Sequence, residues 1–155
     1  SLVDTNVLVY RFDGRFPEKQ RVATELLRAG AAEGTIYLPH QAIVEFVAAV
    51  TRPIGGAGSL LDPHDARGDA EELLSQFDVL FPDEELLRVA LRGAAAYQLS
   101  WFDAHMWAYA ERFGLPELLS EDFQHGRLYG TVQVVNPFGR TDVKPGRAPG
   151  STRRA

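Results

Sequence analysis

Short apolar runs alternate with stretches of helical periodicity along most of this sequence, and the alternation constrains the fold more than any other feature. The apolar runs predict buried β-strands at residues 2–3, 35–38, 78–81, 118–119 and 131–135. The helical spacing predicts helices at residues 5–12, 17–30 or 17–34, 41–51, 63–76, 84–94 and 101–113. Strands separated by helices indicate a three-layer α/β architecture, with a mostly parallel central sheet and helices on both faces.

Composition predicts one domain followed by a tail. The chain has 155 residues, a length that suits one domain, which we place at residues 1–138. Residues 139–155 are rich in Gly, Pro, Ser and Arg, and they predict a basic, flexible C-terminal tail. The tail carries five basic side chains and one acidic side chain, a net charge of +4, which leaves −9 on the domain. Such a domain does not favour nucleic-acid binding by bulk charge, although acids that hold divalent cations can still support nucleic-acid cleavage.

Several absences narrow the class of protein further. The sequence has no Cys, which excludes a disulfide framework and a thiolate metal site. It has no long uncharged apolar run, and its opening residues lack a basic region before the first apolar run. We therefore expect no transmembrane helix, no signal peptide and a cytoplasmic location.

Acidic residues occupy the positions where an α/β sheet places its ligands, which is outside the carboxyl ends of the strands. Asp4 directly follows the first predicted strand, and Glu121 and Asp122 directly follow the fourth. Asp103 lies in the first turn of its helix, where the helix dipole favours a carboxylate. Glu45 lies on a helix face of small residues, which leaves space beside its carboxylate.

Each of these acids alone has an ordinary explanation, as a loop acid, a helix-terminal charge or a solvated side chain. Together, four acids from four separate elements can converge at one end of the sheet. Their like charges repel one another unless cations are bound. Oxygen ligands suit Mg²⁺ or Mn²⁺, and Mg²⁺ sites commonly include substrate phosphates, so the pattern points to phosphoryl chemistry.

At these residues the sequence resembles the PIN-domain ribonucleases of the VapC toxin type. The resemblance rests on four blocks in order: VDTN at residues 3–6, Glu45 in QAIVEFVAAVTRP, Asp103 in LSWFDAHMWAYAERFG and Asp122 in LLSEDFQHG. The ending TVQVVNPF at residues 131–138 is also typical of one branch of this type. The order and spacing of the four blocks carry the resemblance, because a single DTN motif would be weak evidence.

The resemblance implies a PIN-like fold and a Mg²⁺-dependent endoribonuclease, with Mn²⁺ able to substitute. It implies that the catalytic and metal-binding residues are Asp4, Glu45, Asp103 and Asp122. The family pattern selects Asp122 over its neighbour Glu121, and we expect the unselected acid to face solvent because adjacent side chains of an extended chain diverge. The resemblance also implies that the protein is the toxin of a type II toxin–antitoxin pair, forms a homodimer and is inhibited by a VapB-type antitoxin.

Other residues are candidates for supporting roles. Thr5, Asn6 and Ser120 can orient the carboxylates, although each can equally cap a local turn or helix. Four arginines near the expected cleft edge are candidate RNA contacts, with surface solvation the simpler explanation for each alone: Arg11, Arg15, Arg52 and Arg127.

A competing hypothesis is a non-catalytic PIN-like module for RNA binding or assembly, which the four acids disfavour. A phosphorylation receiver would need paired acids after the first strand, and an aspartate-nucleophile phosphatase would need Asp at position 6, where this chain has Asn6.

Overall fold

A six-stranded sheet organises residues 1–139, the part of the chain that the computed structural model describes. The strands are β1 (Leu2–Val3), β2 (Tyr37–Pro39), β3 (Asp78–Leu80), β4 (Glu117–Leu119), β5 (Leu128–Tyr129) and β6 (Val132–Val135). Their order in the sheet is β3-β2-β1-β4-β6-β5. Every neighbouring pair is parallel except β5 with β6, so the expected α/β class and mostly parallel sheet are confirmed.

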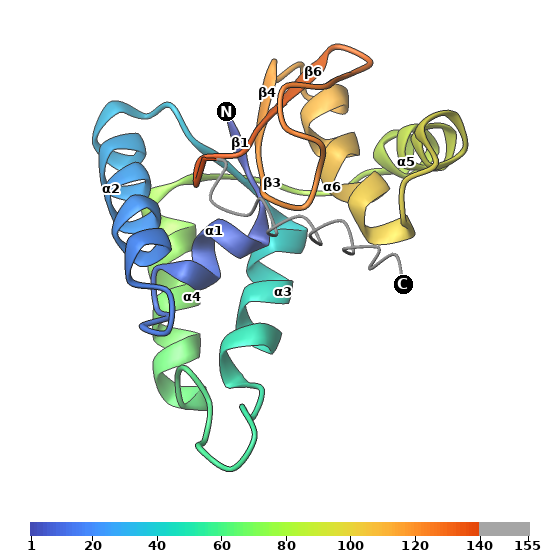
Figure 1. The fold of residues 1–155 in the computed structure, drawn as a ribbon. Helices are drawn as coiled ribbons and strands as arrows, with labels where there is room; N and C mark the ends of the chain where they lie inside the picture. Colours follow the sequence, from blue (N-terminus) through green and yellow to red (C-terminus); the bar gives the residue numbers. More distant parts are fainter. Residues whose placement is uncertain (140–155) are drawn as a thin grey trace, which may run out of the picture.

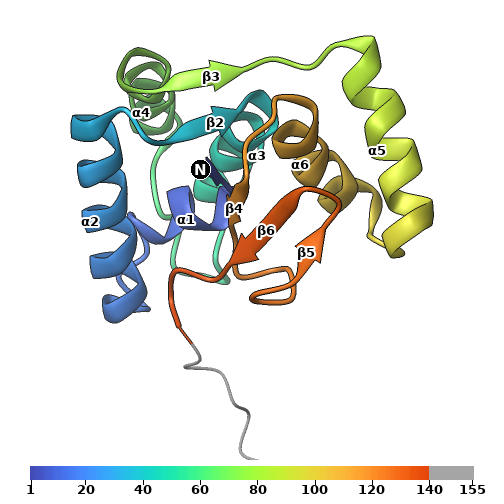
Figure 2. The same cartoon turned by 90° about the horizontal axis from the view of Figure 1, so that it is seen from above.

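Helices cover both sides of this sheet. They are α1 (Thr5–Tyr10), α2 (Pro17–Glu33), α3 (His40–Thr51), α4 (Pro63–Gln76), α5 (Glu84–Tyr97) and α6 (Trp101–Arg112). Figure 2 shows α2 on one side of the sheet and α5 with α6 on the other. In Figure 1, β1 runs downward into α1, and α3 and α4 run side by side below the sheet. The parallel strands therefore deliver their carboxyl ends to the lower side of the molecule in that view.

Local sequence sets the helix ends. Pro17 is the first residue of α2, where a missing backbone N–H removes no helical hydrogen bond. Gly34 ends the same helix in the left-handed conformation, with φ of 66°. The Asp83 carboxylate accepts a hydrogen bond of 2.8 Å from the backbone N–H of Leu86 and so caps α5. These ends agree with the sequence-based predictions for the two helices.

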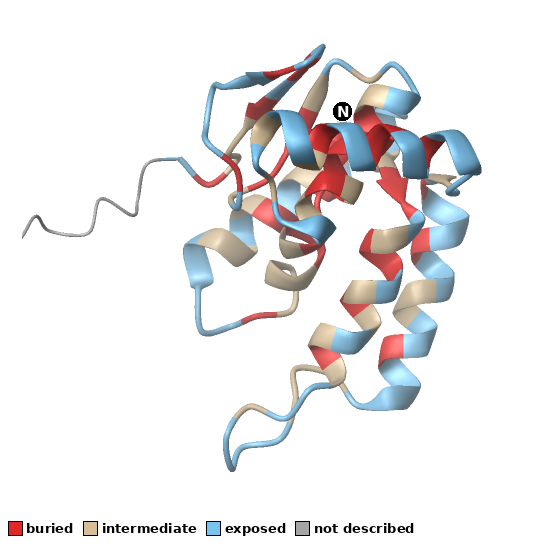
Figure 3. Cartoon of the chain, turned by 90° about the vertical axis from the view of Figure 1, so that its right-hand side faces the viewer, coloured by how far each residue is buried: buried red, intermediate tan, exposed pale blue. Residues whose placement is uncertain are grey.

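Close packing fixes the helices against the sheet and against one another. Buried residues gather where the helices meet the sheet, and exposed residues lie on the outer faces (Figure 3). A Cβ atom added to Gly93 of α5 would lie 2.1 Å from Cζ3 of Trp107, so glycine is required where α5 crosses α6. The indole Nε1 of Trp107 also donates a 3.0 Å hydrogen bond to the carbonyl of Tyr129, which ties α6 to β5.

Two expectations need correction or fall outside the described region. The sequence did not predict β5, because a strand of two residues with an exposed Leu128 has no readable alternation. Of the expected tail, residues 140–155 lie outside the described residues. Among residues 1–139, no helix combines the length and apolar character needed to span a membrane.

Candidate active site

The ends of β1 and β4 bring acidic residues together beside the start of α1. The backbone N–H of Asp4 donates to the carbonyl of Leu119 at 3.0 Å, which fixes the two strand ends side by side. The hydroxyl of Ser120 then donates to Oδ2 of Asp4 at 2.6 Å. The same hydroxyl oxygen accepts the backbone N–H of Asp122 at 3.1 Å. Ser120 therefore links the acid that follows β1 to the loop that follows β4.

Asp4 is a nearly buried carboxylate, with a relative exposure of 5%. It caps α1 by accepting a 2.6 Å hydrogen bond from the backbone N–H of Thr5. Desolvation by burial is the largest cause of its raised pKa, which is about 7. Hydrogen bonds from Ser120 and Thr5 lower this pKa, whereas the charges of Asp122 and Glu45 raise it. An acid so placed gains stability from any bound cation.

Glu45 reaches the same place from the middle of α3. Its Oε2 atom accepts the hydroxyl of Thr5 at 2.7 Å, although the two residues are 40 positions apart in the sequence. Its Oε1 atom accepts Nε2 of Gln41 at 2.7 Å, one helical turn earlier. Gln41 Nε2 also donates to the carbonyl of Phe102 at 3.1 Å, at the start of α6. The side chains of Thr5 and Gln41 thus hold both oxygens of Glu45.

Asp122 completes the group from the loop after β4. Asn6 Nδ2 donates to its Oδ2 at 3.1 Å. Burial raises the Asp122 pKa, the Asn6 hydrogen bond lowers it, and the charges of Asp103 and Glu45 raise it. Asp103 lies in the first turn of α6, where its backbone N–H donates to Oγ of Ser100 at 3.3 Å. The structure therefore brings Asp103 within electrostatic reach of Asp122.

Glu121 points to a different group of residues. Its carboxylate forms a 2.9 Å ion pair with Nζ of Lys19 on α2 and accepts a hydrogen bond from the hydroxyl of Tyr10. The Glu121 side chain is only 21% exposed, so the expectation that it would face solvent is wrong. The side chains of Glu121 and Asp122 do diverge, but Glu121 pairs with Lys19 on a neighbouring helix instead of facing water.

A cleft of about 480 Å³ opens in front of this group. Its lining includes the carboxylates of Glu45 and Asp122 together with Asn6, and it includes the basic residues Arg15 and Arg52. The two remaining acids are not part of this lining: Asp4 and Asp103. The buried Asp4 is therefore not on the cleft surface.

Two of the four candidate arginines lie elsewhere. Arg11 lines a separate groove between α2 and the end of α4. The guanidinium of Arg127 lies over the ring of Tyr129, 4.4 Å from its centroid, and Arg127 does not line the cleft. The expectation that all four would gather at one edge therefore fails, because these arginines project from different elements and sequence position alone does not show which way each one points.

The chemistry of the site fits a hard divalent cation, although the metal geometry is not preformed. Among residues 1–139, no group of three or more acidic or histidine side chains is arranged to hold a metal ion. The available donors are nevertheless all oxygens, the type that Mg²⁺ and Mn²⁺ prefer. Within the same described residues, the buried amide oxygens of Asn6 and Gln41 have no hydrogen-bond partner. Buried polar atoms normally have partners, so these two mark the site as incomplete.

Sequence reasoning missed several residues that shape this cleft. Gln41 precedes Glu45 by four positions, a spacing that places two side chains on one helix face and could have signalled their contact. Tyr10, Phe16 and Asp13 also line the cleft. No signal in the sequence marked these three, because their positions depend on how α1 meets α2.

Known proteins with this architecture include toxin–antitoxin proteins. A toxin–antitoxin complex from Klebsiella pneumoniae contains a chain that is 20% identical, with a TM-score of 0.64 over 88% of this chain and 97% of that chain. VapBC2 from Rickettsia felis, bound to a promoter DNA fragment, gives 12% identity and a TM-score of 0.62 over 86% and 95% of the two chains. At these identities the likeness shows the fold alone.

A third similar structure is that of a toxin with a known cleavage target. Mycobacterium tuberculosis VapC20, described as a toxin that cleaves the sarcin–ricin loop, is 15% identical, with a TM-score of 0.56 over 78% of this chain and 88% of that chain. No curated protein sequence matches this chain. The profile of the PIN domain, in contrast, matches residues 1–130, which include Asp4, Glu45 and the loop that carries Asp122. This chain therefore belongs to the PIN domain family.

Proposed function

We propose that this protein is a divalent-metal-dependent endoribonuclease and the toxin of a type II toxin–antitoxin pair. One observation carries the proposal: the acid that follows β1 lies within electrostatic reach of acids on α3 and in the loop after β4, and the latter two line a cleft that also holds two arginines. The raised pKa of Asp4, near 7, supports the proposal, because burial and like charges make this cluster unfavourable without a cation. The fold shared with a toxin that cleaves the sarcin–ricin loop adds support.

The proposed chemistry assigns a separate task to each residue. Asp4 and Asp122, with Asp103, are the candidates to hold Mg²⁺ or Mn²⁺. When bound, such an ion lowers the pKa of water and neutralises charge on the scissile phosphate. Glu45 is the remaining carboxylate, and it either contributes to ion binding or accepts a proton from the attacking water.

Neutral side chains keep these acids in position. Thr5 and Gln41 fix the two oxygens of Glu45, at 2.7 Å each. Ser120 and Asn6 hold Asp4 and Asp122, respectively. Hydrogen-bonding partners that orient metal ligands typically change metal affinity or activity by about 10–100-fold when removed. We expect losses of that size from Thr5→Val or Ser120→Ala.

The partners of a toxin belong to the same proposal. The structural relatives include chains from toxin–antitoxin complexes. We propose that an antitoxin of the VapB type inhibits this protein and that two copies of the chain form a homodimer. Size-exclusion chromatography with light scattering, on the chain alone and with its antitoxin, measures both assemblies.

Cleavage of a labelled single-stranded RNA tests the activity. Wild-type protein is incubated with the RNA in Mg²⁺, in Mn²⁺ and in EDTA, and the products are separated on a gel. We expect internal cleavage with either cation and none in EDTA. Glu45→Gln should lose this activity, whereas Glu33→Gln, at the exposed end of α2, should retain it.

The alternative is a PIN-domain module that binds RNA without cleaving it. It predicts the same RNA binding but intact RNA in both cations, across a range of substrates. Wild-type and Glu45→Gln proteins would then behave alike. That result would exclude the endoribonuclease and leave the binding module.

A further inference from the structure

An ion pair at the rim of the cleft, between a buried aspartate and an exposed arginine, has no task in the chemistry proposed above. The Asp13 side chain is only 4% exposed and pairs with Arg15 at 2.7 Å. Its Oδ2 accepts Nη2 of Arg15 at that distance, and its Oδ1 accepts Nε at 2.9 Å and the backbone N–H of Arg15 at 3.1 Å. This two-pronged pairing holds a guanidinium in one orientation. The hydrogen bonds from Arg15 lower the Asp13 pKa despite its burial, so the carboxylate stays charged and holds the guanidinium in place.

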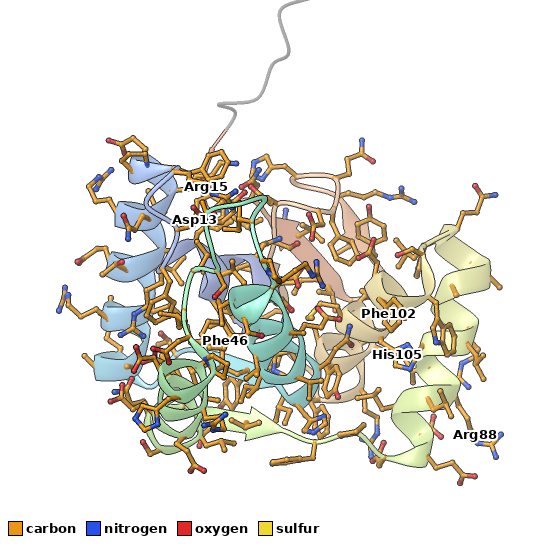
Figure 4. The ribbon with its side chains drawn as sticks, turned by 90° about the horizontal axis from the view of Figure 1, so that it is seen from below. Asp13, Arg15, Phe46, Arg88, Phe102 and His105 are labelled. Carbon is orange, nitrogen blue, oxygen red and sulfur yellow. The ribbon has the colours of Figure 1, made fainter. Side chains whose placement is uncertain are left out.

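The fixed guanidinium faces the cleft rather than the core. Arg15 lines the cleft, and its side chain is 55% exposed. Figure 4, which looks onto the side where the parallel strands end, shows Asp13 and Arg15 adjacent to each other, apart from Phe102 and His105 on α6. A guanidinium carries five N–H donors, and the contacts with Asp13 use one from each of two nitrogens. The remaining donors can bind a second anion.

The surroundings of Arg15 select a particular kind of anion. Arg52, at the end of α3, has an exposed side chain and lines the same cleft. The guanidinium of Arg15 lies 5.6 Å from the ring centroid of Phe16, and that ring is 44% exposed. Basic groups beside an exposed aromatic ring are the combination that binds single-stranded nucleic acids, where phosphates meet the cations and bases stack on the ring.

We propose that Arg15, held by Asp13, and Arg52 form a binding site for a backbone phosphate of single-stranded RNA next to the scissile phosphate. The inference rests on the proposed function, which it deepens by assigning the contacts that position the strand. Asp13 is a positioning residue, because it acts on the phosphate only through Arg15. An acidic peptide would meet the same arginines, but it has no base to stack on Phe16.

Salt dependence of RNA binding provides the direct test, because each phosphate contact releases counterions. A fluorescent oligouridine is titrated with the protein in Ca²⁺, and gels confirm that the RNA stays intact. For Arg15→Gln and for Arg52→Gln, we expect binding about tenfold weaker and a slope of log K against log salt that is shallower by about 0.7. Arg28→Gln removes a matched arginine that pairs with Glu25 on the outer face of α2, and it should change neither quantity.

Variants of the buried acid separate positioning from charge. Asp13→Asn keeps the Arg15 charge but loosens its orientation, so the salt slope should stay near the wild-type value while binding weakens. The double variant Asp13→Asn, Arg15→Gln leaves a neutral pair, and it tests the site even where Arg15→Gln alone is destabilised by an unpaired buried carboxylate. The double variant should show the shallower slope. Melting temperatures are measured for each protein, because a merely structural pair would change these alone.

The outcomes distinguish this proposal from the one on which it rests. Arg15-dependent binding without cleavage in Mg²⁺ or Mn²⁺ would leave the phosphate site standing and remove the endoribonuclease. The opposite result would overturn the phosphate site alone: the protein cleaves RNA, but Arg15→Gln, Arg52→Gln and the double variant all keep the wild-type slope of log K against log salt. Loss of polyglutamate binding in Arg15→Gln, with an unchanged RNA slope, would also overturn it and assign the arginines to an acidic peptide.

Discussion

Acidic residues in the cleft and acidic residues on the outer helices have opposite electrostatic surroundings. On α2, Glu18 pairs with Arg21 at 3.0 Å and Glu25 pairs with Arg28 at 2.6 Å, each three residues apart on an exposed face. In the acidic group beside the cleft, Asp4 is buried, and the charged residues that affect its pKa are further acids. Arginine neighbours lower the pKa of Glu25, whereas burial raises that of Asp4.

The difference shows that the unfavourable interactions between like charges are concentrated in the acidic group beside the cleft. A helix of this composition readily satisfies its acids with arginines one turn away, as α2 does. The cleft acids receive neutral donors instead: Thr5, Asn6, Gln41 and Ser120. Such donors orient carboxylates without cancelling their charge. The cleft therefore keeps a negative charge that a cation can neutralise.

Of the substitutions that test this comparison, Asp4→Asn should have the largest effect on RNA cleavage. It removes the buried charge and a proposed metal ligand, while an amide oxygen can still accept the backbone N–H of Thr5. We expect RNA cleavage to fall by more than about 100-fold, beyond the usual loss for a residue that only orients a ligand. Gel assays at saturating Mg²⁺ measure the rate, and circular dichroism checks the fold. Wild-type cleavage by the folded variant would remove Asp4 from the active site.

The next largest difference in cleavage is expected between variants of the adjacent acids Asp122 and Glu121. Asp122→Ala removes a cleft carboxylate that is a proposed metal ligand, and we expect a severe loss of cleavage with weaker Mn²⁺ binding. Glu121→Ala removes the partner of Lys19, so it should lower the melting temperature while cleavage at saturating metal stays within about threefold of the wild type. Calorimetric Mn²⁺ titration and RNA assays measure both. The reverse ranking in folded proteins would place Glu121 at the metal.

Stability in the absence of metal should depend on pH through Asp4. Its pKa is about 7 in the folded protein against an ordinary value of 3.8. Between these pH values the folded state binds a proton that the unfolded state has released, so the free energy of unfolding should fall as pH rises from about 4 to about 7 and then level off. The three-unit span corresponds to at most about 4 kcal/mol. The raised pKa of Asp122 acts in the same direction.

Thermal melts in EDTA across this pH range measure the effect. Asp4→Asn should flatten the dependence, and Mg²⁺ or Mn²⁺ should raise the wild-type melting temperature most at the high end of the range, where the cluster is charged. The same pH dependence in wild type and Asp4→Asn, in either direction, would contradict the assignment to Asp4.

The smallest effect is expected on the outer face of α2. Arg28→Gln removes a pair in which both side chains are more than half exposed. Exposed ion pairs contribute little to stability because water and salt screen them. We expect no measurable change in melting temperature or in RNA cleavage. A clear loss of either would mean that α2 contributes to an interface or to substrate binding.

The sequence could predict most of the fold because the relevant signals are local. Pro17, Asp83 and Ser100 set helix starts from positions within a turn of them, and apolar spacing identified five of the six strands. Acids at strand ends could also be identified as candidates, since the carboxyl edge of a parallel sheet is where ligands bind. Those signals lie within a few residues of the features that they mark.

Only the tertiary structure decided which side chains meet. Ser120 and Asp4 lie 116 positions apart, yet their contact joins the two strand ends. The same packing pairs Glu121 with Lys19 and places Arg11 at another groove. It also buries the Asp13 side chain, which pairs with Arg15. Contacts of this kind depend on the angle and register at which whole helices and strands pack. Local spacing determines which face of an element a side chain occupies, but not what that face will touch.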